Sequence, residues 1–109
     1  MTSITQLRDV ARKERETADG LRDQAKKYRD RANQVPNDAD QQDRLDATNQ
    51  AQQYEEQAAQ HDATALKYEQ QATDLESTVI DIDRRKQDVQ QAAQNELNKL
   101  DQQEKSLIG

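Results

Sequence analysis

The chain has 109 residues, a formal net charge of −6 and a sequence pI near 4.7. This acidity argues against nucleic-acid or anionic-membrane binding, because both partners are themselves negative. Only 31% of the residues are hydrophobic, and the chain contains two glycines and one proline. Such a composition excludes a thick globular core and favours long helices.

The first expected element is a helix over residues 3–34. Apolar residues recur at heptad spacing from Ile4 onward, as in a coiled coil. Pro36 disfavours helical geometry at Val35, so the helix should end near Gln34. Side chains that can cap the start of the next helix follow at once: they are Asn37, Asp38 and Asp40.

The second expected helix starts near residue 40 and meets no further glycine or proline before Gly109. In "AQQYEEQAAQHDATALKYEQQATDL", alanine returns every seven residues with a larger residue between successive alanines. Antiparallel pairing sets each alanine against a large side chain, whereas parallel pairing would stack alanine on alanine and lose apolar burial. The pattern therefore predicts an all-α fold, an antiparallel alanine-rich coiled-coil helical hairpin over residues 1–75.

Two sets of residues should hold this hairpin together. The expected seam consists of Leu7, Ala11, Ala18, Leu21, Ala25, Tyr28, Ala51, Tyr54, Ala58, His61, Ala65, Tyr68 and Ala72. Antiparallel pairing also brings a row of arginines beside a row of carboxylates. These charge rows are Arg8, Arg15, Arg22 and Arg29 on the first helix, and Glu55, Asp62, Glu69 and Glu76 on the second.

The pairing register should face Ile4 with Leu75 and Ala18 with His61, although a seven-residue slip preserves the same alternation. Residues 1–36 hold nine Lys/Arg and six Asp/Glu, and residues 37–75 hold two and nine. This opposite charge favours pairing of the two segments with each other.

Residues 76–109 should continue the second helix as an extension for oligomerisation or partner docking. The apolar stripe continues there with no helix left to face it, and a lone helix of this kind is marginal in water. The expected partner-binding residues are Val79, Ile82, Lys86, Val89, Glu96, Leu100 and Leu107. The alternative is a break near Ser77–Thr78 and a fold-back into a three-helix bundle.

His61 is the only histidine in the chain. A catalytic histidine needs a cleft and an orienting partner, which a two-stranded coil does not offer. We interpret it as a large seam residue, and we expect no catalytic residue, no metal ligand, no cofactor and no small-molecule substrate.

These patterns together predict a non-enzymatic structural or adaptor protein that assembles through its C-terminal helix. Its partner would be a second copy of itself, as a homodimer, or a helix of another protein. The alternative function is that of a small acidic regulatory protein, an inhibitor or chaperone that binds one protein target. Because no apolar run approaches membrane-spanning length, we expect a soluble cytoplasmic protein without a membrane or nucleic-acid partner.

Overall fold

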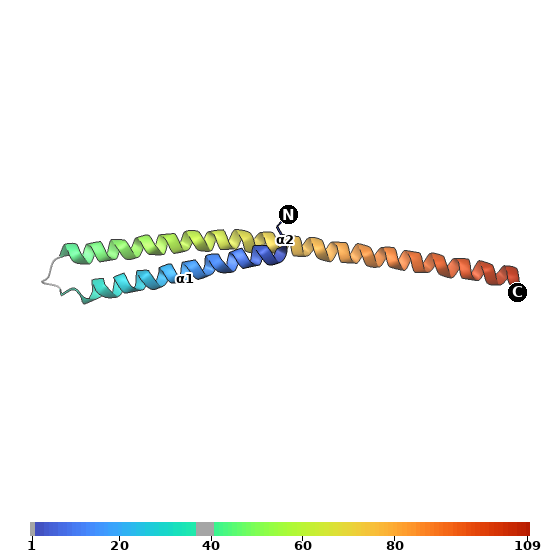
Figure 1. The fold of residues 1–109 in the computed structure, drawn as a ribbon, viewed down its shortest axis with the longest axis horizontal. Helices are drawn as coiled ribbons and strands as arrows, with labels where there is room; N and C mark the ends of the chain where they lie inside the picture. The colour runs from blue at the N-terminus through green and yellow to red at the C-terminus, as the bar shows by residue number, and fades with distance from the viewer. Residues whose placement is uncertain (1, 37–40) are drawn as a thin grey trace. The chain divides into compact units, whose positions relative to one another are not determined.

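The computed structural model describes residues 2–36 and 41–109 of the chain. Its two α-helices are α1, Ile4–Gln34, and α2, Gln41–Ile108. Helix α1 lies alongside the first part of α2 and runs in the opposite direction (Figure 1). The predicted all-α antiparallel helical hairpin is therefore confirmed.

Local sequence explains both ends of α1. Ser3 is the N-cap, and its Oγ accepts a hydrogen bond from the Gln6 backbone N–H at 3.1 Å. The Gln6 side chain accepts one in return from the Ser3 backbone N–H at 2.9 Å, which completes a capping box. Val35 ends the helix in an extended conformation, with φ −70° and ψ 122°, as its position before Pro36 requires.

The start of α2 lies close to the expected position. The helix begins at Gln41, one residue after the predicted start near residue 40. The suggested capping residues Asn37, Asp38 and Asp40 lie outside the described residues.

Contacts along the chain define two compact units, Met1–Thr73 and Asp74–Gly109. The first unit contains the hairpin and all the buried residues that the structure describes. The second unit is entirely helical up to Ile108, and all its side chains are exposed except that of Leu75, which is half-buried. None of the described helices has a segment both long and apolar enough to cross a membrane.

The alternative three-helix bundle is wrong, because α2 continues without a break through Ser77 and Thr78. The Thr78 hydroxyl donates to the Asp74 carbonyl oxygen one turn earlier, at 3.2 Å. A threonine that bonds back in this way is accommodated inside a helix. The sequence around it also has no glycine or proline to end the helix.

Candidate functional site

The hairpin seam combines buried alanines with larger side chains that remain partly accessible. Ala18, Ala51 and Ala65 have no exposed surface, and Leu7 is the one larger side chain classed as buried among the described residues. The other buried seam alanines are Ala11, Ala25, Ala58 and Ala72. The half-buried seam residues are Leu21, Tyr28, Tyr54, His61 and Tyr68. Small side chains in the centre let the two backbones approach closely, and the large ones cover the edges.

A polar pair crosses this apolar seam. The Nδ1 atom of His61, on α2, lies 2.5 Å from Oε2 of Glu14, on α1. Their side chains are 40% and 27% exposed, so the contact is only partly screened by water. The sequence placed His61 opposite Ala18 and did not anticipate this contact. The missed signal was Glu14 itself, a charged residue at a core heptad position one turn from Ala18.

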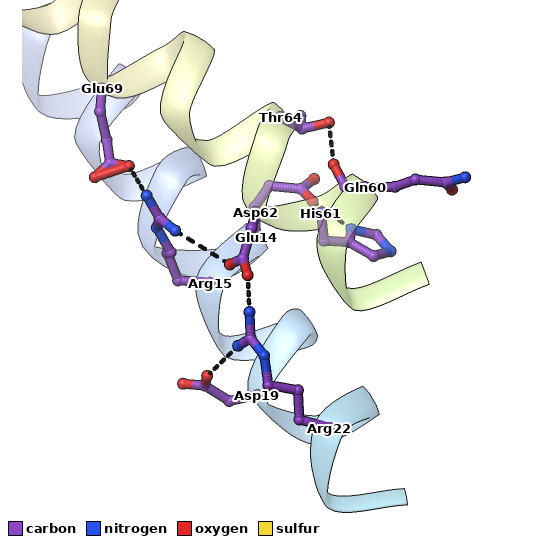
Figure 2. Close-up of polar contacts among 9 residues, drawn as sticks. All are labelled: Glu14, Arg15, Asp19, Arg22, Gln60, His61, Asp62, Thr64 and Glu69. Atoms are coloured by element: carbon purple, nitrogen blue, oxygen red, sulfur yellow. Dashed lines mark hydrogen bonds and ion pairs between the residues drawn. The ribbon is translucent and has the colours of Figure 1, made fainter. Parts of the chain in front are cut away.

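The charge rows form a continuous network beside the seam. Arg15 donates from Nη1 to Asp62 at 3.2 Å and from Nη2 to Glu69 at 2.5 Å. Asp62 also forms an ion pair with Arg22, which in turn donates to Asp19 on its own helix at 2.9 Å. Figure 2 shows this chain of contacts running from Glu69 to Asp19 through alternating acidic and basic groups.

A second interhelical ion pair joins Arg29 and Glu55. The guanidinium donates from Nε and Nη2 to the two carboxylate oxygens, at 2.6 Å and 2.8 Å. This two-pronged hydrogen bond holds the pKa of Glu55 below its ordinary value and raises the pKa of Arg29. The remaining members of the two rows, Arg8 and Glu76, are exposed.

These contacts show which register the hairpin adopts. In the register that faces Ala18 with His61, Arg15 lies between Asp62 and Glu69, and it contacts both. A slip by one heptad in either direction would place Arg15 beside a different pair of acidic residues. Because the charge rows would also pair after such a slip, charge alone does not choose the register; the observed ion pairs show that the hairpin adopts the one that faces Ala18 with His61.

Aromatic packing adds a further cross-helix contact near the turn. The rings of Tyr28 and Tyr54 stack with centroids 5.7 Å apart and planes 26° apart. The sequence predicted both as seam residues but faced each with an alanine. Because neighbouring layers are close along the helix axis, the two rings meet diagonally, and such a pair adds about 0.5–1.5 kcal/mol beyond simple burial.

The Asp74–Gly109 unit contains the expected partner-binding residues, and all of them are exposed. Ile82 is 45% exposed, Leu100 50% and Val89 69%. Heptad spacing places these residues on one face of the helix. We call this face the tail stripe: Val79, Ile82, Lys86, Val89, Glu96, Leu100 and Leu107.

Most of the side chains described above either contact the facing helix of the hairpin or lie exposed on the tail stripe. No cluster of three or more metal-ligating side chains occurs in the described ranges, 2–36 and 41–109. His61 contacts the carboxylate of Glu14, and both side chains belong to the hairpin seam. Compared with known protein families, curated proteins and solved structures, the chain gives no match.

Proposed function

We propose that this chain is a non-enzymatic structural or adaptor protein that assembles with another helix through its tail stripe. The observation that carries the proposal is the contrast between the two units. In Met1–Thr73 the apolar heptad positions are covered, whereas the same heptad phase in Asp74–Gly109 remains exposed. Burying that face would remove apolar surface from water, which stabilises an assembly by about 25 cal/mol per Å² of apolar surface buried.

The hairpin has the character of a rigid support in this proposal. Its two helices are joined by the alanine seam and by interhelical ion pairs. The tail stripe is a row of exposed apolar side chains, interrupted by Lys86 and Glu96, and exposed apolar surfaces often mark interaction sites. A cytoplasmic location belongs to the same proposal, and cell fractionation with an antibody to the chain tests it.

The deciding experiment measures the mass of the assembly that contains this chain, both purified and in an extract of the cells that express it. The assembly that contains the parent chain should have a mass above the 12.5 kDa of a single chain. The double variant Ile82→Lys/Leu100→Lys should be monomeric, because two contacts would require burial of unpaired charge. A chain truncated after Glu76 should also be monomeric and keep the helical content of the hairpin.

A matched control separates a loss of contact from a general gain in solubility. Ile80 and Ile108 are 55% and 79% exposed, but heptad spacing places them off the tail stripe. The variant Ile80→Lys/Ile108→Lys adds the same charge and should assemble like the parent. Equal masses for the parent, the stripe variant and the control, in both preparations, would contradict the proposed assembly surface.

A further inference from the structure

Two charged residues interrupt the apolar tail stripe, and they carry opposite charges. Lys86 and Glu96 are both exposed. Ten residues separate them, or about 15 Å along a helix, so their side chains cannot meet within one chain. Ile82, Lys86 and Val89 line the same shallow hollow on the helix surface. Any helix that covers this apolar surface must therefore also accommodate the charge of Lys86.

The hairpin shows how this chain accommodates a charged group in a seam. Glu14 lies at a core heptad position and contacts His61 from the facing helix. A charge enclosed by apolar side chains is costly unless a polar partner faces it. The same requirement applies to Lys86 and Glu96 once the tail stripe is covered.

Resting on the function proposed above, we infer that the partner helix is the tail of a second copy of this chain, bound antiparallel. A twofold axis near Gln91 sets Lys86 of each copy against Glu96 of the other. The same register faces Ile82 with Leu100. Both charges thus gain opposite partners without any contribution from another protein.

Next to the twofold axis, this register also repeats the packing rule of the hairpin. It faces Val89 with Ala93 of the second copy, a large side chain against an alanine, as in the buried seam of Met1–Thr73. The interface would therefore continue the heptad phase already present along α2, with one small-to-large layer and with large side chains paired at Ile82 and Leu100.

Other ways of pairing two tails leave the charges uncompensated. A parallel, in-register pair sets Lys86 against Lys86 and Glu96 against Glu96. An antiparallel slip of seven residues in one direction faces Lys86 with Val89, and a slip in the other direction faces Glu96 with Ala93. Mismatches of this kind determine which coiled-coil partners and registers form.

Two contacts at the rim oppose the favoured register. It brings Asp83 near Glu104 and Arg85 near Lys99 of the second copy. These positions flank the seam and face solvent, where salt screens repulsion over about 8–10 Å. Lys86 and Glu96 lie on the seam itself and are screened less, so their pairing sets the register.

The test is a charge exchange in the full-length chain, followed by sedimentation or light scattering. The purified parent should have twice its chain mass of 12.5 kDa. Lys86→Glu alone and Glu96→Lys alone should each weaken self-association at least tenfold, because each places like charges across the seam. The double variant Lys86→Glu/Glu96→Lys should restore the dimer.

Mixing the two single variants is the sharpest arm of this test. In a heterodimer of Lys86→Glu with Glu96→Lys, every seam charge faces an opposite one, so the mixture should dimerise more tightly than either variant alone. The variant Arg85→Glu should tighten the parent dimer, because it replaces repulsion from Lys99 by attraction. Circular dichroism checks that each chain retains its helical content.

Cysteine cross-linking reports the direction of pairing, since the chain has no native cysteine. Gln90 lies next to the proposed twofold axis, and Gln90→Cys should be joined to its counterpart by a short thiol cross-linker. Val79→Cys should not, because the two copies of Val79 lie at opposite ends of the interface. A parallel pair would instead join the two Val79→Cys chains.

The possible failures separate this inference from the proposed function. If assembly depends on the tail but is not changed by the charge exchange or by mixing the single variants, the antiparallel register is wrong. The tail stripe would then still be the assembly surface. A purified chain that is monomeric, but part of a larger assembly in the cell extract, would overturn the second copy as partner. A monomer in both preparations would overturn both proposals.

Discussion

His61 on α2 meets Glu14 on α1 across the hairpin seam, with 2.5 Å between Nδ1 and Oε2. Each side chain is half-buried, so losing one partner leaves the other without compensation in a partly dry environment. His61→Leu or Glu14→Leu alone should lower the free energy of unfolding by about 0.5–1 kcal/mol. The double variant should be at least as stable as the parent, because two apolar side chains replace a polar pair.

Urea unfolding of the four proteins in this cycle provides the measurement. Strictly additive effects of the two substitutions would show that Glu14 and His61 are not energetically coupled.

The alanine seam predicts a strong penalty for added volume. Ala58→Leu and Ala65→Leu should each lower the free energy of unfolding by about 1–3 kcal/mol, since overpacking forces the helices apart or distorts side chains. Ala63 is exposed on the same helix, and Ala63→Leu should change stability by less than about 0.5 kcal/mol. Thermal melting that is the same for all three variants would refute close packing at the seam.

The interhelical charge network predicts a salt-dependent loss of stability. Arg15→Glu/Arg22→Glu places two new carboxylates beside Asp62, which contacts both arginines. The melting temperature should fall at low salt and recover in part at high salt, because salt screens the repulsion. Lys27→Glu, a single charge reversal at an exposed position, is the control for each of the two substitutions and should show little salt dependence. Equal salt dependence of both variants would argue against a specific role for the network.

The pKa of Glu55 provides a test in acid. Arg29 lowers that pKa below the ordinary value of 4.5, so the folded state favours the ionised carboxylate. The stabilisation is therefore complete above about pH 4.5 and is lost as pH falls through the lower pKa of the folded state. Glu55→Gln should reduce stability at neutral pH, and its difference from the parent should vanish in stronger acid. Glu56→Gln provides an exposed neighbour for comparison. A difference from the parent that persists unchanged in strong acid would rule out this linkage.

The sequence predicted the parts of the fold that depend on repetition. Alanine at every seventh residue determined the antiparallel pairing, and Pro36 fixed the end of α1 to within one residue. These features depend on backbone geometry and side-chain size, which can be read directly from the order of residues.

Diagonal contacts between side chains could not be predicted from heptad positions. The heptad assignment faces His61 with Ala18 and Tyr28 with Ala51, yet the longer side chains reach across to Glu14 and to Tyr54. Which diagonal is used depends on rotamers and on the closeness of the helices. The tail stripe differs from the hairpin seam, because no second helix within Asp74–Gly109 faces it. The role of the tail stripe therefore could not be predicted from contacts inside the chain.

The placement of the tyrosines gives this protein an optical reporter of the hairpin alone. All three tyrosines of the chain are seam residues of Met1–Thr73, and the chain has no tryptophan. Tyrosine emission therefore follows the opening of the hairpin alone, including the separation of the Tyr28–Tyr54 stack. Far-ultraviolet circular dichroism reports the helices of both units together. When both signals are recorded during one thermal scan, helix that melts without any change in tyrosine emission belongs to Asp74–Gly109.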